Sequence, residues 1–293
     1  MAGPIHRGAY GFRLHYTDPE QELTDLIELD ASMPEVTVAW RHASTTVDIE
    51  DVGRDRVAYG HRKAGAFWAC RDPATITFDF PTPPVPGSLV HPNLTIGISV
   101  HARWRGDLTL HGGAFETSAG AWGIMGAREA GKSAMLAELA SRGYPIVADD
   151  LLALQGSMAW AGPDCVDLRP DTAERFEKSR YLGIVGGRPR YRLSTPPSRP
   201  VLPFRGFFIL DWHESRQVVV EPMDPRERLK WLYQQEYILL VGWPDPAKHL
   251  RLLGLPAWNV RRPPHWGGTD EVIGRILEIT ENPAYSTELV VDD

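Results

Sequence analysis

Short runs of alternating apolar and polar residues fill the first third of the chain, and turn residues separate them. A period of two is typical of strands that bury one face. The runs with this pattern are Tyr10–Tyr16, Val36–Trp40, Thr45–Ile49, Ala66–Cys70, Thr75–Phe80 and Leu94–Val100. A short helix is expected around Glu20–Leu29, and Pro81–Pro92 is expected to be a loop because proline cannot donate to a sheet ladder. The N-terminal region, residues 1–104, is therefore predicted to be rich in β-structure.

Helical periodicity joins the strand patterns in the rest of the chain. Apolar runs predict buried strands at Trp122–Met125, Ile146–Ala148, Leu151–Leu154, Gly206–Leu210, Gln217–Glu221 and Ala257–Val260. Helical spacing or good helix formers predict helices at Ser133–Arg142, Pro225–Leu240, Ala247–Leu253 and Thr269–Thr280. A helix-like segment also runs from Asp167 to Arg180, and Thr269 or Asp270 is expected to cap the last helix. We predict an α/β (α+β) fold with a second domain at residues 105–284 and an acidic tail at residues 285–293.

Composition and charge argue against several classes of protein. The chain has 293 residues, of which 43% are hydrophobic, which suits one large domain or two small ones. Its net charge of −7 argues against binding nucleic acid or an anionic membrane over a wide surface. Cys70 and Cys165 are too few for a disulfide framework and match no metal-binding spacing. We see no signal-peptide core and no run near the roughly 18 apolar residues of a membrane span, so we expect a soluble, cytoplasmic protein. The apolar and aromatic residues of the N-terminal region could form a homo-oligomer contact, bind a peptide, or make up the core of that region.

A glycine-containing octet after the strand Trp122–Met125 is the strongest functional signal. The octet Gly126-Ala-Arg-Glu-Ala-Gly131-Lys132-Ser133 fits G-x-x-x-x-G-K-[ST], the pattern of loops that cradle phosphates. The helix behind it begins with unpaired N–H groups and a positive dipole end, and both favour an anion. The residues expected to contact a nucleotide are Gly126, Ala127, Arg128, Glu129, Ala130, Gly131, Lys132, Ser133 and Ala134. The alternative is an ordinary strand–helix turn in which Lys132 and Ser133 are solvated.

Two carboxylates, Asp149 and Asp150, follow the next predicted strand. Ligands bind at the carboxyl ends of such strands. Adjacent residues at a strand end can point in different directions, so one carboxylate can face a metal ion while the other accepts the proton of a hydroxyl. Lys132 would then reach the β- and γ-phosphates of ATP, and Ser133 would help to hold Mg²⁺. The alternative is that the aspartate pair caps the turn that follows it.

Two further candidates are basic. His111, followed by Gly112 and Gly113, lies just upstream of the strand that precedes the octet, and such a histidine is either structural or close to the phosphates. Arg188, Arg190 and Arg192 occupy alternate positions, so they could share one side of an extended segment. This segment is either a solvated basic loop or a clamp for phosphate or an acidic substrate, because the guanidinium fork matches such oxygens.

Together these motifs resemble the HPr kinase/phosphorylase superfamily, which includes short kinase homologues in peptide-modification gene clusters, such as those of lasso peptide biosynthesis. The match covers residues 105–155, with His111-Gly-Gly-Ala, the octet and Val147–Asp150, and it extends more loosely to about residue 280. The later elements of the match are Leu168-Arg169-Pro170, Arg188–Arg192 and Val260-Arg-Arg-Pro. The phosphate loop and aspartate pair also resemble those of phosphoenolpyruvate carboxykinases, considered relatives of the family.

The resemblance implies a mixed central sheet flanked by helices, with ATP and Mg²⁺ as cofactors. The catalytic residues that it implies are Asp149, His111, Lys132, Arg188 and Arg190, and the metal-binding residues are Ser133 and Asp150. In this scheme Asp149 would be the base for the acceptor, and His111 would lie near the transferred phosphate. The arginines would stabilise the charge on that phosphate.

Two features depart from the family pattern. The variable part of the phosphate loop usually contains a glycine, where this chain has Arg128-Glu129-Ala130. Glu129 could weaken phosphate binding, change the pose of the nucleotide or simply point outward. The downstream signature loop of the bifunctional HPr enzymes is not found, so neither phosphorylase activity nor HPr as the substrate is expected.

The leading prediction is an ATP- and Mg²⁺-dependent kinase that transfers the γ-phosphate to a Ser or Thr hydroxyl of a peptide or protein, such as a ribosomally made peptide precursor. A small-molecule kinase and a nucleotidyltransferase are the alternatives among enzymes. A nucleotide-binding regulator without catalysis, compromised by Glu129, is the alternative of another class. Lys132, Ser133, Asp149 and Asp150 favour catalysis, because a protein that only binds need not retain all four. The expected partners are a nucleotide and a hydroxyl acceptor, without nucleic acid or membrane.

Overall fold

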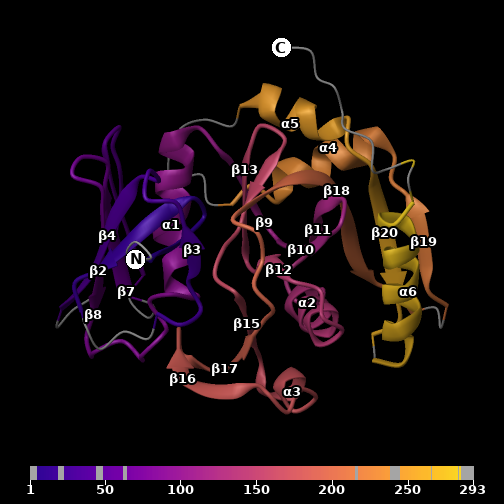
Figure 1. The fold of residues 1–293 in the computed structure, drawn as a ribbon, viewed down its shortest axis with the longest axis horizontal. Helices are drawn as coiled ribbons and strands as arrows, with labels where there is room; N and C mark the ends of the chain where they lie inside the picture. The colour runs from indigo at the N-terminus through magenta and orange to yellow at the C-terminus, as the bar shows by residue number, and fades with distance from the viewer. Residues whose placement is uncertain are drawn as a thin grey trace.

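Three β-sheets and six α-helices build the described part of the chain (Figure 1). The computed structural model describes residues 5–18, 23–43, 49–61, 65–214, 217–237, 245–264, 266–282 and 284. A strand-rich N-terminal part precedes mixed sheets that carry helices, so the predicted α/β fold class is confirmed.

The N-terminal sheet has eight strands in the order β3-β1-β2-β4-β8-β7-β6-β5. The sheet is mixed, because β4 runs parallel to both β2 and β8 while the other pairs are antiparallel. Its strands are β1 (His6–Ala9), β2 (Phe12–Tyr16), β3 (Ile27–Leu29), β4 (Glu35–His42), β5 (Ile49–Val52), β6 (Arg56–His61), β7 (Gly65–Cys70) and β8 (Thr75–Phe80). Tyr10 and Gly11 both have positive φ and form the two-residue turn between β1 and β2, as this type of hairpin requires.

The short helix expected around Glu20–Leu29 is wrong in its described part. Ile27 and Leu29 are buried and Glu28 is exposed, which is the alternation of a strand, and β3 pairs with β1. The strand predicted at Thr45–Ile49 lies outside the described residues except for Ile49, where β5 begins.

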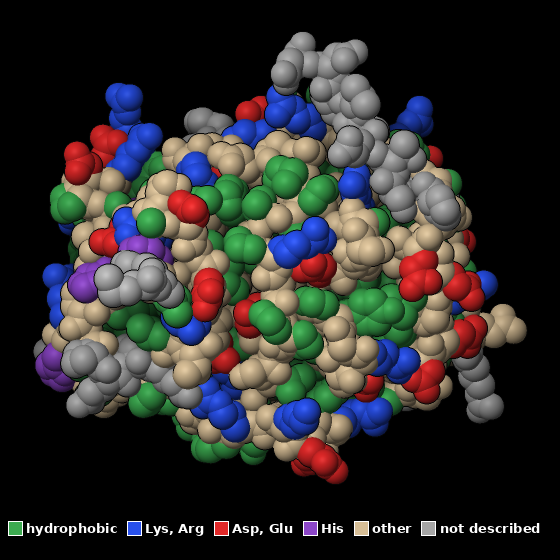
Figure 2. Space-filling model, in the orientation of Figure 1, with side chains coloured by type: hydrophobic (Ala, Val, Ile, Leu, Met, Phe, Trp, Pro, Cys, Tyr) green, Lys and Arg blue, Asp and Glu red, His purple; other side chains and the backbone are tan. Residues whose placement is uncertain are grey.

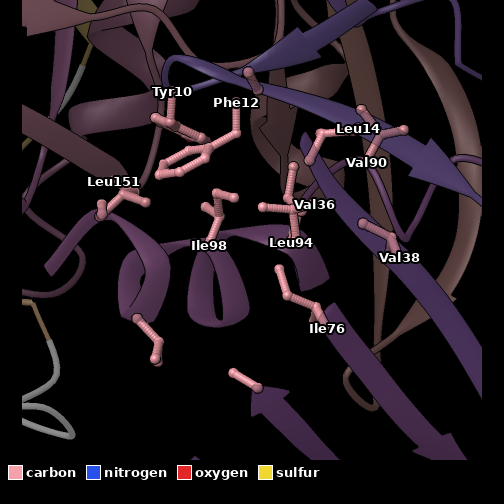
Figure 3. Packing of buried hydrophobic residues seen from close by; sticks show 14 of the residues in the cluster. Tyr10, Phe12, Leu14, Val36, Val38, Ile76, Val90, Leu94, Ile98 and Leu151 are labelled. Carbon is pink, nitrogen blue, oxygen red and sulfur yellow. The ribbon is translucent and has the colours of Figure 1, made fainter. Parts of the chain in front are cut away.

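The segment Leu94–Val100, predicted as a strand, belongs instead to helix α1 (Asn93–Arg105). This helix packs against β7 of the N-terminal sheet on one side and against β9 (Leu108–His111) and β13 (Leu151–Gln155) on the other. A helix buried on all sides loses the polar face by which helices are recognised in a sequence. Figure 3 shows Leu94 and Ile98 among buried side chains of the N-terminal sheet. The predicted domain boundary, at residue 104, falls at the end of α1 and stays a prediction.

Strand β11 (Gly120–Gly126) is fully buried in the nine-stranded sheet and leads into the octet. It pairs in parallel with β18 (Val201–Trp212), which pairs in parallel with β20 (Ala257–Arg262). The other strands of this sheet are β9, β10 (Gly113–Thr117), β12 (Ile146–Ala148), β13, β14 (Met158–Trp160) and β19 (Val219–Pro222). Because parallel strands end at the same edge, Gly126, Trp212 and Arg262 come together there.

A three-stranded antiparallel sheet in the order β15-β17-β16 lies at the lower side of the molecule in Figure 1. Its strands are β15 (Cys165–Leu168), β16 (Arg180–Val185) and β17 (Arg188–Ser194). The helix-like segment expected from Asp167 to Arg180 is largely wrong, since α3 (Pro170–Ala173) is a single turn and Arg180 already begins β16. In residues 170–180 the buried side chains are Ala173 and Phe176. Two are too few for the apolar stripe of a longer helix.

Four other helices are α2 (Lys132–Ser141), α4 (Pro225–Gln234), α5 (Pro246–Leu253) and α6 (Thr269–Thr280). Helix α4 ends earlier than predicted, and residues 238–240 of that prediction lie outside the described ranges. The predicted cap of α6 by Thr269 or Asp270 is wrong. The 3₁₀ turn η1 (Trp266–Gly268) leads directly into α6, so its N-cap position is Gly268, and no side chain caps the helix.

Charges of both signs are interspersed over the face that Figure 2 shows. Cys70 and Cys165 are free thiols. None of the helices in the described ranges has the length and apolarity needed to span a bilayer.

Asp164, just before β15, makes the stability of the fold sensitive to pH. Burial, together with repulsion from Asp25, raises the pKa of Asp164 from its ordinary 3.8 to about 7. The folded state therefore holds this proton more tightly than the unfolded chain, and stability falls as the pH rises from about 4 to 7. We expect Asp164→Asn to raise the unfolding temperature at pH 8 by about 2 to 4 °C and to leave it unchanged below pH 4.

A pH series of thermal unfolding curves checks this prediction, because Asn keeps the acceptor that receives the Ser198 N–H at 3.2 Å. The exposed Glu177→Gln variant is the control. A constant difference between wild type and Asp164→Asn across the series would contradict the prediction.

Candidate active site

The loop between β11 and α2 turns tightly at two glycines. Gly126 has φ 149° and Gly131 has φ 82°, both in the region that favours glycine. A Cβ on Gly126 would lie 2.6 Å from the carbonyl oxygen of Leu210 on β18, so only glycine fits there. The N-cap of α2 is Gly131, and no side chain caps this helix. The N–H groups of its first turn are therefore available to an anion.

Lys132 folds back over this loop. Its Nζ donates to the carbonyl oxygens of Gly126 at 3.0 Å and Ala127 at 3.1 Å. Burial lowers the pKa of Lys132, and the nearby charges of Asp150 and Asp149 oppose that shift. The ammonium thus stands beside the free N–H groups of α2, where phosphate oxygens could take the place of the two carbonyls.

Asp149, directly after β12, is buried and fully engaged. Its Oδ1 accepts from Ser133 Oγ at 2.9 Å, and its Oδ2 accepts from the Asp167 N–H at 3.3 Å and lies 3.6 Å from His91 Nε2. Burial alone would raise the pKa of Asp149, but His91, Ser133 and the Asp167 N–H bring it below the ordinary value. Burial would lower the pKa of His91, yet Asp167 and Asp149 together raise it. Ser133 thus donates to Asp149, whereas the resemblance implies that Ser133 and Asp150 hold Mg²⁺ together.

Asp150 is the accessible member of the aspartate pair. Its φ of 72° turns the chain sharply after Asp149, and its side chain is 40% exposed. The Oδ1 atom of Asp150 lies 3.4 Å from Nδ1 of His111, and the same Nδ1 lies 3.2 Å from the Asp150 carbonyl oxygen. His111 reaches this position because β9 pairs with β13, which puts His111 opposite Leu151. Asp150 therefore offers a carboxylate that a substrate can approach.

A cavity of about 510 Å³ brings most of the predicted residues together. Those that line it are His111, Arg128, Glu129, Gly131, Lys132, Ser133, Ala134, Asp149, Asp150, Arg188 and Arg190. Gly126, Ala127 and Ala130, which were also predicted to contact the nucleotide, are not among the lining residues. Of the three alternating arginines, Arg192 does not reach the cavity, because it is fully buried against Asp167.

Five arginines are among the residues that line the cavity, namely Arg128, Arg169, Arg188, Arg190 and Arg262. Arg169 donates to Glu129 at 2.9 Å, and Arg190 lies 3.9 Å from Asp167. Burial, together with repulsion from Arg190, Arg169 and Arg128, lowers the pKa of Arg188. Like charges gathered in this way are stabilised by a bound anion.

Several lining residues were not identified from sequence patterns. His91 comes from the loop after β8, Trp212 from the end of β18, and Trp266 from η1. Arg169 and Arg262 also line the cavity, and they belong to the later segments of the family resemblance. His91 and the tryptophans carry no local motif, and only the tertiary structure places them at the cavity.

The residues present fit a nucleotide with Mg²⁺. Within the described ranges, no group of three or more His, Cys, Asp or Glu side chains is arranged to hold a metal ion. Mg²⁺ usually binds through one or two carboxylates and the phosphates of its nucleotide rather than through a protein cage. Ser133, Asp149 and Asp150 supply hard oxygen ligands beside the uncapped start of α2.

Comparisons with known proteins add a distant similarity in fold. No protein-family model and no curated protein matches this sequence. Among solved structures, the HPr(Ser) kinase/phosphatase from Coxiella burnetii is similar at a TM-score of 0.31 and 14% identity, over 59% of this chain and 92% of that chain. A similarity at this level says nothing about the chemistry of this chain, which depends on the residues of the site.

Proposed function

We propose that this chain is an ATP- and Mg²⁺-dependent phosphotransferase that acts on a hydroxyl group. The observation that carries the proposal is the convergence of four parts on one cavity. They are the uncapped start of α2, Lys132, the Ser133–Asp149 pair and the accessible Asp150. Phosphoryl transfer needs a phosphate cradle, a balance for the negative charge, and a group that orients or deprotonates the acceptor. An accessible carboxylate beside the cradle favours catalysis over nucleotide binding alone.

The donor side of the site would hold the nucleotide phosphates. The N–H groups of the first turn of α2 and the ammonium of Lys132 would bind the phosphate oxygens. Ser133 and Asp149 would hold Mg²⁺, which, when bound, supplies positive charge to the phosphate oxygens. His91, 3.6 Å from Asp149, favours the ionised form of this carboxylate, which is the form that binds a metal.

We assign the role of base to Asp150, whereas the family resemblance implied Asp149. Both oxygens of Asp149 are engaged and the residue is only 5% exposed, whereas the side chain of Asp150 is 40% exposed. Asp150 would take the proton of the acceptor hydroxyl while the hydroxyl oxygen bonds to the γ-phosphorus. The bond from that phosphorus to the oxygen it shares with the β-phosphate breaks, and ADP leaves. His111, 3.4 Å from Asp150, would hold the carboxylate in place.

The acceptor that we propose is a Ser or Thr of a peptide or protein. Strand β16 forms the outer edge of the three-stranded sheet, next to β17 with Arg188 and Arg190. Tyr181 and Ile184 on β16 are 56% and 55% exposed. An open strand edge with apolar side chains can bind an extended peptide by strand addition. A small anionic hydroxyl compound is the second candidate, because arginines line a cavity of small-molecule size, about 510 Å³.

Mass spectrometry tests the proposed function. The purified protein is incubated with ATP, Mg²⁺ and a panel of serine peptides with acidic, neutral or basic flanks, together with small hydroxyl metabolites. A gain of one phosphate on an acceptor supports the proposal, and Lys132→Ala should lose it. A gain of a nucleotide would instead indicate nucleotidyl transfer. ATP binding without any transfer across the panel would favour a nucleotide-binding regulator.

A further inference from the structure

Glu129 has a backbone conformation that is unusual for its residue type. Its φ is 68°, in the left-handed region where a side chain is strained and where glycine is the usual residue. Glu129 belongs to Arg128-Glu129-Ala130, the variable part of the loop in which the resembled family usually has a glycine. Its side chain is 60% exposed, and its carboxylate pairs with Arg169. A strained residue persists only when its surroundings hold it.

Contacts from separate elements hold this part of the loop. Trp212 Nε1, at the end of β18, donates to the carbonyl oxygen of Glu129 at 2.9 Å. Arg169 Nη2 donates to Glu129 Oε1 at 2.9 Å. Arg262 Nη2, at the end of β20, donates to the carbonyl oxygen of Ala130 at 2.8 Å. The Glu129 conformation therefore depends on two contacts, and a third fixes the next peptide.

Arg262 and Trp212 also support each other. The guanidinium of Arg262 lies over the Trp212 ring at 4.0 Å from the ring centroid, and Arg262 is only 4% exposed. Burial lowers the pKa of Arg262 to about 10, and its Nε has no partner among the described residues. A Cβ on Gly131 would lie 2.4 Å from Arg262 Nη2, so the glycine lets the guanidinium reach the loop. Arg262 is thus a rigid support packed against the start of α2.

We propose that Trp212, Arg169 and Arg262 are positioning residues that hold the phosphate loop in its binding conformation and stabilise the positive φ of Glu129. The inference rests on the proposed nucleotide site. In a trans peptide the carbonyl and the next N–H point in opposite directions. Fixing the carbonyl of Ala130 therefore also fixes the N–H of Gly131, which begins the row of donors at α2. Without these contacts Glu129 would relax toward negative φ and the donors would lose their alignment.

A rescue experiment tests this inference. The dissociation constant of ATP with Mg²⁺ is measured by calorimetry for wild type, Trp212→Phe, Glu129→Gly and the double variant. Phe keeps an aromatic ring beside Arg262 and removes the N–H donor, so Trp212→Phe should weaken binding roughly three- to tenfold. Glu129→Gly supplies the comparison background, because glycine adopts positive φ without strain and no longer needs the support of Trp212. In the E129G background Trp212→Phe should change the constant less than about twofold.

Trp104→Phe is the matched control, because the Trp104 indole has no hydrogen-bond partner among the described residues and does not line the cavity. Equal weakening by Trp212→Phe with and without Glu129→Gly would overturn the inference. Failure of wild type to bind ATP would contradict the proposed function instead. In that case the unfolding temperatures of the same four proteins test the inference. Trp212→Phe should lower the unfolding temperature less in the E129G background than in the wild-type background. An equal decrease in both backgrounds would overturn the inference.

Discussion

Replacing Asp150 by asparagine is expected to lower kcat roughly 10²- to 10⁴-fold, the usual contribution of a general base, while the protein stays folded. The side chain is 40% exposed and its close partner is His111 at 3.4 Å, so little packing is lost. The measurement is the initial rate of phosphate incorporation into the acceptor identified by mass spectrometry, at saturating ATP and Mg²⁺. Circular dichroism and unfolding temperature show whether the fold is intact.

Asp149→Asn should behave differently and so distinguish the two carboxylates. Asp149 accepts from Ser133 at 2.9 Å, and the two would hold Mg²⁺ together. Loss of the Asp149 carboxylate should therefore raise the Mg²⁺ concentration needed for half-maximal rate. Glu174→Gln, on an exposed residue outside the cavity, is the control. If Asp149→Asn instead lost kcat at saturating Mg²⁺ and Asp150→Asn only needed more Mg²⁺, the base would be Asp149.

Replacing Arg192 by methionine is expected to destabilise the fold by about 3–5 kcal/mol, the usual effect of breaking a buried ion pair. Arg192 is fully buried and donates to both oxygens of Asp167, at 2.9 and 3.3 Å, and to Asp25 at 3.3 Å. It also donates to the carbonyl oxygens of Gly87 and His91. Methionine fills similar space but removes the nearest cation from two buried carboxylates, which keep the more distant Arg180 at 3.8 Å from Asp25 and Arg190 at 3.9 Å from Asp167. Denaturant unfolding measures the loss.

Arg142→Met is the control for this prediction. Arg142 pairs with Asp270, which is 92% exposed, and an exposed pair of this kind contributes at most about 1 kcal/mol. Adding Asp25→Asn and Asp167→Asn to the Arg192→Met variant should recover part of the loss, because the uncompensated charges are removed. A loss for Arg192→Met no larger than that of the control would contradict the assignment of Arg192 as a buried clamp.

Arg192 also connects the N-terminal part of the chain to the cavity through hydrogen bonds. One guanidinium ties β17 to Asp25, before β3, and to the loop after β8 that carries His91. His91 in turn lies 3.6 Å from Asp149. We therefore expect the Arg192→Met variant to show a changed Mg²⁺ dependence where it remains folded.

Local patterns were sufficient for the elements that depend on neighbouring residues. The octet places two glycines, Lys132 and Ser133 between the end of β11 and the start of α2, so their relation to helix α2 follows from spacing alone. The alternation of Arg188, Arg190 and Arg192 predicted an extended segment, and all three lie on β17. Asp149 and Asp150 follow β12 because a short apolar run ends there.

Environment decided what spacing could not. Arg188 and Arg190 line the cavity, whereas Arg192 is buried against Asp25 and Asp167, although the sequence presents the three alike. The segment Leu94–Val100 alternates like a strand yet forms part of α1, because that helix is buried on all sides. Periodicity in a sequence identifies an element that buries one face. It does not identify an element such as α1 that is buried on several faces.

The sequence by itself determined where the glycine-containing loop begins, which helix follows it and which strand end carries the aspartate pair, since each depends on residues close together in the chain. Only the tertiary structure decided which aspartate is accessible, because that follows from the φ of 72° at Asp150 and the burial of Asp149. It also decided that Trp212 and Arg262, from strands far along the chain, lie against Glu129 and Ala130. Long-range strand pairing brings these residues to one edge, and no local pattern encodes that pairing.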